Sequence, residues 1–230
     1  MMKALRIAAL AALALVGAGA GAFWLNDRQE RAAFAHVETI ERGASFRDAA
    51  LIGEAKRLPV AAAYLTSPYE YQRNPSFCGP TSAAAVLRST GRGATQESVL
   101  EGSARQPVLG ILPMGMTLDE EAALLQHATG KPVTILRDVD PAAFRAHLAR
   151  VNDPGVRYVI NFHRGPMFGR GHGHFSPILG YLADRDLVLV GDVNEDYGFY
   201  LVESARLFEA MDTIDSATKK KRGLLLVSLQ

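Results

Sequence analysis

One cysteine, Cys78, precedes an apolar, alanine-rich stretch that runs from Pro80 to Ser89. The stretch predicts a helix that stops at Gly91 and whose first turn begins just after the cysteine. A thiol at a helix N-terminus lies among unpaired backbone N–H groups and the positive end of the helix dipole, and both lower its pKa. Cys78 is therefore a candidate nucleophile. The amide of Gln72, six residues upstream, could donate to a developing oxyanion. The alternative interpretation makes Cys78 a small buried residue and Gln72 a surface residue.

A thiol nucleophile needs a base, and the base needs a partner that orients it. His174 stands at the start of a β-rich run, and the next such run ends in Gly191-Asp192-Val193. If the two runs form a hairpin, His174 and Asp192 are opposed or diagonal neighbours on one face. The carboxylate would then hold the imidazole for proton exchange with the thiol.

The same histidines allow a metal interpretation. His172 and His174 on one strand face, with His163 or Asp192 nearby, could bind a divalent cation. No further ligand motif accompanies them, so we expect no metal site and no cofactor bound by the protein. A single cysteine also excludes an intramolecular disulfide and a thiolate cluster.

The elements that would position these residues are helix-rich first and strand-rich second. A capping box at Thr117 and Glu120 predicts a helix that runs to Thr129 and ends at Gly130. Asp140-Pro141 opens another helix. The remaining elements are expected at 95–101 (helix), 156–162, 175–182 and 187–193 (strands), 203–211 (helix) and 223–229 (strand). The predicted class is α+β, with the cysteine on the helical part and the histidine and aspartate on an antiparallel sheet.

Residues 1–26 are not expected to belong to the fold. Lys3 and Arg6 precede an apolar run over 7–25, and Ala20-Gly21-Ala22 suits cleavage of a signal peptide near Ala22. The run is also about long enough to cross a bilayer, which takes roughly 20 residues. The expectation is export, to the periplasm or as an inner-membrane anchor. We expect residues 27–57 to form a linker or packing arm and residues 58–230 the catalytic domain.

The balance of charge argues against a polyanionic partner. The formal net charge is +1 in 230 residues, without the basic face that nucleic-acid binding normally shows. The one basic run, Lys219 to Arg222, is interpreted as a solvated loop. Oligomeric state is left open.

Several short segments together resemble phytochelatin synthases over about Pro59 to Ser228. The segments are Asn74–Gly79, Gly173–Ile178, Asp192-Val193, Phe208–Asp215 and Arg222-Gly223. The resemblance implies a papain-like fold in which Cys78 is the nucleophile, His174 the base and Asp192 the orienting acid. It also implies that Gln72 completes the oxyanion hole, and that Arg164 and Tyr197 handle substrate.

The resemblance further implies glutathione as the substrate. The thiolate would attack the carbonyl of the cysteinyl-glycine bond and release glycine. The γ-glutamylcysteinyl group on the enzyme would then pass to a second glutathione, giving phytochelatin, or to water.

Two departures from the family pattern affect this expectation. The chain has no further cysteine after Cys78, so Cd or Zn would enter as a thiolate complex of the substrate. The family's basic stretch after the triad aspartate is replaced by the acidic Asn194–Tyr197. Acidic groups there should hold an anionic second glutathione poorly, so we expect hydrolysis to outweigh transfer.

Two other functions remain open from the sequence. A papain-like peptidase that trims leader peptides also pairs a glutamine six residues before the cysteine with histidine and aspartate. An exported binding module that keeps the fold without catalysis is the other.

Overall fold

The structure, a computed structural model, describes residues 28–29 and 32–230. The predicted signal peptide or anchor, residues 1–26, lies outside the described residues. Within them, no helix combines the length and the apolar character needed to cross a bilayer.

A six-stranded antiparallel sheet forms the centre of the domain, in the order β1-β6-β2-β3-β4-β5. The central strand β2 is buried along its whole length, as expected for a strand with both faces covered. The strands are β1 (Val133–Leu136), β2 (Val156–His163), β3 (Gly173–Leu182), β4 (Leu187–Gly191), β5 (Phe199–Glu203) and β6 (Gly223–Ser228).

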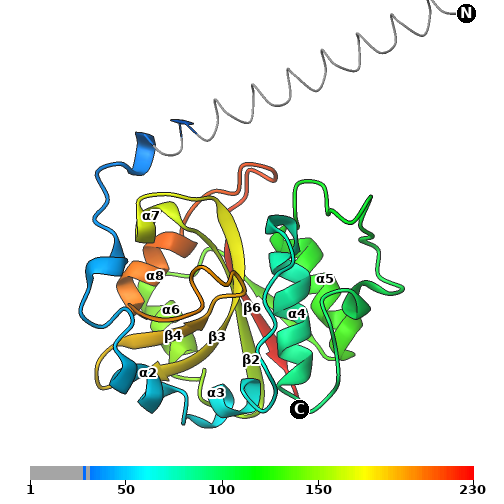
Figure 1. Ribbon diagram of the computed structural model, residues 1–230, viewed down its shortest axis with the longest axis horizontal. Coiled ribbons are helices and arrows are strands. Elements are labelled where there is room, and N and C mark those ends of the chain that lie inside the picture. Colours follow the sequence, from blue (N-terminus) through cyan, green and yellow to red (C-terminus); the bar gives the residue numbers. More distant parts are fainter. Residues whose placement is uncertain (1–27, 30–31) are drawn as a thin grey trace, which may run out of the picture.

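Helices cover both faces of the sheet (Figure 1). On one face pack α3 (Pro59–Tyr64), α4 (Cys78–Arg88) and α5 (Leu118–Thr129), around a core that includes Val159 and Leu179. On the other face pack α6 (Pro141–Leu148), α7 (Gly165–Phe168) and α8 (Ser204–Met211). The predicted α+β class is confirmed, with the cysteine on a helix and the histidine on the sheet.

The local predictions that rested on capping chemistry are confirmed. Thr117 and Glu120 form the reciprocal capping box of α5, and Gly130 ends that helix in the left-handed conformation at φ 68°. Asp140 accepts a hydrogen bond from the N–H of Ala143 and caps α6. The strands predicted at 156–162, 175–182, 187–193 and 223–229 are present as β2, β3, β4 and β6.

Other predictions were wrong or incomplete. The helix expected over 95–101 is a turn followed by a single 3-10 turn, η3 (Ser98–Leu100). The two edge strands β1 and β5 were missed. They are four and five residues long. The helix predicted over 203–211 is present as α8, which β5 enters directly. The helix α2 (Ala49–Ala55) was also missed.

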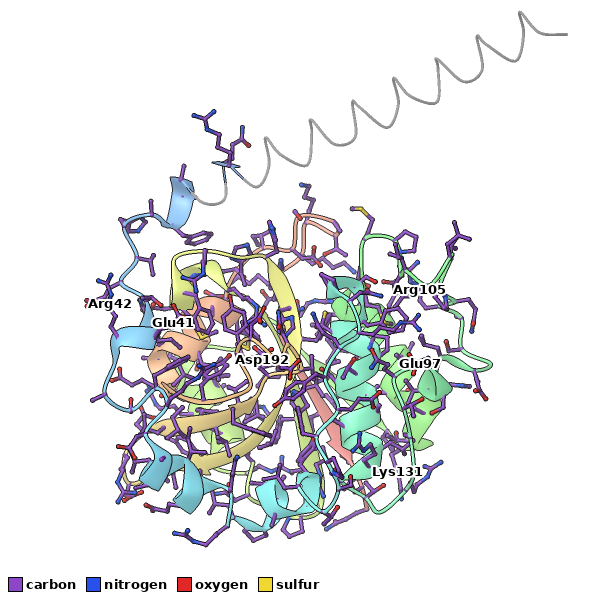
Figure 2. All side chains as sticks on the ribbon, in the orientation of Figure 1. Glu41, Arg42, Glu97, Arg105, Lys131 and Asp192 are labelled. Atoms are coloured by element: carbon purple, nitrogen blue, oxygen red, sulfur yellow. The ribbon has the colours of Figure 1, made fainter. Side chains whose placement is uncertain are left out.

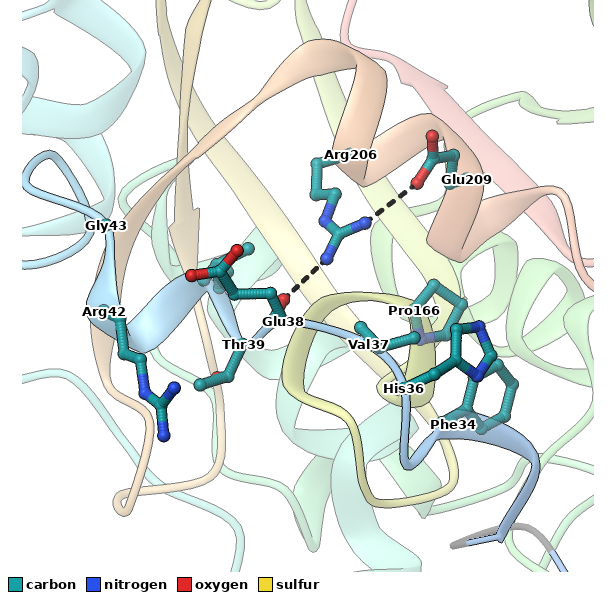
Figure 3. A pocket seen from close by; sticks show the side chains of 11 residues that line it. Phe34, His36, Val37, Glu38, Thr39, Arg42, Gly43, Pro166, Arg206 and Glu209 are labelled. Carbon is teal, nitrogen blue, oxygen red and sulfur yellow. Dashed lines mark hydrogen bonds and ion pairs between the residues drawn. The ribbon is translucent and has the colours of Figure 1, made fainter.

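The segment before α2 packs on the same face of the sheet as α6, α7 and α8. Phe46 is buried and stacks on Tyr200 at 5.4 Å between ring centroids. Nearer the N-terminus is a short 3-10 turn, η1 (Ile40–Arg42). Just before it, the carbonyl of Glu38 accepts a hydrogen bond from Arg206 of α8. A cavity of about 760 Å³ lies between this segment and α8 (Figure 3). None of the six predicted site residues lines it, so it is not the predicted active site.

Candidate active site

The loop before α4 holds Cys78 at the helix start. Asn74 accepts hydrogen bonds from the N–H and the hydroxyl of Ser76, and so caps the 3-10 turn η2 (Pro75–Phe77). The Ser76 hydroxyl in turn accepts from the N–H of Leu112. These bonds fix the turn from which α4 begins, with Cys78 as its first residue.

Cys78 is nearly buried, with 6% of its surface exposed. Burial raises the pKa of its thiol to about 11. The backbone N–H groups of Phe175 and Gly79 and the charge of Arg164 act in the opposite direction. The expectation of a lowered thiol pKa is therefore wrong for this state of the molecule, because desolvation of the thiolate exceeds the effect of the helix N-terminus.

The contact with Phe175 brings Cys78 to the strand that carries the predicted base. Phe175 directly follows His174 in β3, and α4 packs against β3. Burial and the nearby Arg164 cation lower the pKa of His174. The two shifts favour the uncharged forms of both groups, a thiol at Cys78 and an imidazole at His174.

His174 and Asp192 meet as predicted. His174 Nε2 lies 2.9 Å from Asp192 Oδ1, and both side chains are buried. This leaves Nδ1 as the ring nitrogen available to a thiol. Asp192 Oδ1 also accepts from the N–H of Asn194 at 2.8 Å. Figure 2 places Asp192 near the middle of the molecule.

Arg164 is bound to Asp192. Its Nη2 lies 2.9 Å from Oδ1 and 2.8 Å from Oδ2, with both side chains buried. Burial acts to raise the pKa of Asp192, but His174 and Arg164 together bring it down to about 2. Tyr197 lies on the other side of the cation, 3.7 Å from guanidinium carbon to ring centroid. The structure thus places Arg164, predicted to handle substrate, against the Asp192 carboxylate, and Tyr197, predicted to do the same, against Arg164.

Gln72 is joined to the same region through the backbone. Its N–H donates to the carbonyl of Val193 at 2.7 Å. Val193 directly follows Asp192, so this bond holds Gln72, the predicted oxyanion-hole residue, next to Asp192. The side-chain oxygen of Gln72 is buried without a hydrogen-bond partner among the described residues. Cys78 and Gln72 thus contact Phe175 and Val193, the residues that directly follow His174 and Asp192.

Two buried charged residues of this region were not singled out from the sequence. Arg222, placed in a solvated basic run, is 6% exposed. Its guanidinium packs on Gly173, where an added Cβ would lie 2.5 Å from Nη2. Glu121 of α5 is fully buried beside Gly79. A signal for Glu121 was present, because it falls on the apolar face of a helix between Leu118 and Leu125.

No group of three or more histidine, cysteine, aspartate and glutamate side chains within residues 28–29 and 32–230 is arranged to hold a metal ion. His174 Nε2 is directed at Asp192.

Comparison with known proteins adds the family. The model of the phytochelatin synthase family matches residues 42–224. The chain belongs to this family. Glutathione gamma-glutamylcysteinyltransferase 1 of Triticum aestivum is 33% identical over 178 residues, which are 71% of this chain and 35% of that protein. Glutathione gamma-glutamylcysteinyltransferase 2 of Arabidopsis thaliana is 30% identical over 201 residues, 80% of this chain and 44% of that protein.

The chain thus spans 35% of the length of the first relative and 44% of the length of the second. Among solved structures, a putative C39-like peptidase from Bacillus anthracis is 13% identical with a TM-score of 0.49, covering 72% of this chain and 96% of that chain. A similarity of that size carries no argument about function.

Proposed function

We propose that this protein is a cysteine acyltransferase or hydrolase that releases glycine from glutathione. The observation that carries the proposal is the buried hydrogen bond between His174 and Asp192, on the strand whose next residue, Phe175, contacts Cys78, in a chain of the phytochelatin synthase family. The names of the relatives support glutathione as the substrate.

In the proposed mechanism each residue of the site has a role. As the Cys78 sulfur attacks the carbonyl of the cysteinyl-glycine bond, its proton passes to Nδ1 of His174. Asp192 holds Nε2 and stabilises the imidazolium that forms. The tetrahedral intermediate collapses, the C–N bond breaks, and the proton goes from His174 to the leaving amine of glycine. The γ-glutamylcysteinyl thioester on Cys78 remains.

The acceptor in the second half of the reaction is proposed to be mainly water. Glu195 and Asp196 are exposed next to Tyr197, in the turn that follows Asp192. Their charges oppose the approach of a second, anionic glutathione. Cd or Zn would take part as a thiolate complex of the substrate, and we propose that the reaction takes place outside the cytoplasm.

The first test follows the products from glutathione by mass spectrometry, for the wild type and for Cys78→Ser. Glycine release by the wild type alone is expected, with γ-glutamylcysteine exceeding longer peptides. A rapid accumulation of phytochelatin would contradict water as the main acceptor. No glycine from either protein, with or without Zn or Cd, would contradict the substrate, and a screen of leader peptides would follow.

Gln72→Ala is expected to lower kcat for glycine release by about 10²–10³-fold, because one oxyanion donor is lost. Binding of glutathione should change little, since the oxyanion forms only after attack. The matched control is Gln106→Ala, which removes an amide that bonds backbone carbonyls at Leu100 and Ser103 in a surface loop. Equal effects of the two substitutions on kcat would remove Gln72 from the oxyanion hole.

A further inference from the structure

Glu121 is a fully buried acid with no partner. It lies in the first turn of α5 and is 0% exposed. Neither carboxyl oxygen has a hydrogen-bond partner among the described residues. An unpaired buried carboxylate costs several kcal/mol or more, and such a group instead keeps its proton. In agreement, burial raises the pKa of Glu121 well above its usual value.

The carboxyl group lies against Gly79, the residue that follows the nucleophile. A Cβ added to Gly79, the residue after Cys78, would be 2.5 Å from Glu121 Oε2 and 3.1 Å from the sulfur of Met116. Glycine is thus required at position 79 for Glu121 to approach the first turn of α4. The charge of Glu121 acts to raise the pKa of Cys78.

Within the described residues, neither Glu121 oxygen accepts a hydrogen bond from a cation. The buried Arg222, which directly precedes β6, packs on Gly173 of β3. The strands β1 and β6, which pack on α5, carry no titratable side chain. The helix α4 carries Cys78 and Arg88, and Arg88 is bound to Glu70. The other charged groups of α5, and Glu97 just before the adjacent η3, are engaged elsewhere: Asp119 with Arg137, Glu120 with Arg105, Glu97 with Arg73, and His127 with the carbonyl of Glu101.

We propose that Glu121 is a positioning residue that controls the charge of the nucleophile: Cys78 forms its thiolate while Glu121 is a neutral acid, and is hindered once Glu121 ionises. Two negative charges in one water-poor site repel each other strongly, so either group ionises more easily while the other is neutral. The inference rests on Cys78 being the nucleophile of the proposed function, but not on glutathione being the substrate.

The test measures the rate at which iodoacetamide alkylates Cys78 between pH 6 and 10, in the full-length wild type and in Glu121→Gln. Glutamine keeps the shape of the neutral acid and cannot ionise. The ratio of the variant's rate to the wild-type rate is expected to rise with pH by about tenfold or more, since each pKa unit at the thiol is a factor of ten. Glu120→Gln is the matched control, because it removes a neighbouring, partly exposed carboxylate and retains a capping side chain. Its ratio should stay flat.

A ratio for Glu121→Gln that stays flat over this range would overturn the proposal, and so would an equal rise in Glu120→Gln. Carbon-13 NMR of the glutamate carboxyls in the wild type provides a second measurement that does not depend on the variant folding. The Glu121 signal should titrate at a higher pH than that of a free glutamate. A signal that titrates like a free glutamate would also overturn it. A rising ratio in a protein that releases no glycine from glutathione would keep this inference and reject the substrate.

Discussion

Asp192→Asn is expected to lower the rate of glycine release by about three to four orders of magnitude, with the thiol still present. Asp192 accepts a hydrogen bond from His174 Nε2, which keeps Nδ1 free of a proton and able to take one from Cys78. An asparagine amide can donate to Nε2 instead. The proton would then reside on Nδ1, and the imidazole would face the thiol as a donor.

The measurement is a single-turnover assay of glycine release, with alkylation of Cys78 to count intact thiols. The matched control is Asp184→Asn, an exposed carboxylate in the turn between β3 and β4, which should keep the wild-type rate. Urea unfolding of both variants separates loss of catalysis from loss of fold. A folded Asp192→Asn protein that retains more than a tenth of the wild-type rate would rule out the orienting role.

The sequence predicted the parts of this site that depend on local chemistry and on the order of elements. A cysteine before an alanine-rich run gave the start of α4, and the His174 and Asp192 strands formed the expected hairpin. Their exact pairing was not predictable. A register shift between Ile178 and Gly180 changes which residues stand opposite each other beyond that point, and the bulge has no clear residue signature.

Burial and electrostatics were the parts that sequence alone did not provide. The helix N-terminus at Cys78 was recognised, but the thiol pKa depends on how much water the packed domain excludes. Arg164 was linked to substrate through resemblance alone. Its contact with Asp192 joins residues 28 positions apart and arises only when β2, α7 and the turn after β4 are assembled. Arg222 was interpreted as part of an exposed basic run because three lysines precede it. Nothing in the run itself indicated that Arg222 is buried.

Arg164→Met is expected to lower the free energy of unfolding at pH 7 by about 3–5 kcal/mol, because it leaves the Asp192 carboxylate buried without its guanidinium partner. Methionine keeps much of the length that packs on Tyr197 but carries no charge. Asp192 should then ionise with more difficulty, so its pKa rises from about 2. Urea unfolding at pH 7 measures the first effect. The control is Arg185→Met, which removes an exposed ion pair with Glu54 and should leave the unfolding midpoint close to that of the wild type.

The pH dependence of unfolding tests the same contact with a definite sign. In the folded wild type the pKa of Asp192 is depressed to about 2, so its contribution is present above pH 4 and is lost as the pH falls toward 2. The loss amounts to about 2 kcal/mol. In Arg164→Met the folded-state pKa is higher, so this part of the stability should be smaller and its loss should begin at a higher pH. Parallel pH profiles for the two proteins would show that the guanidinium does not hold the carboxylate in its charged form. Arg164 would then be free for the role in substrate handling that its resemblance implies.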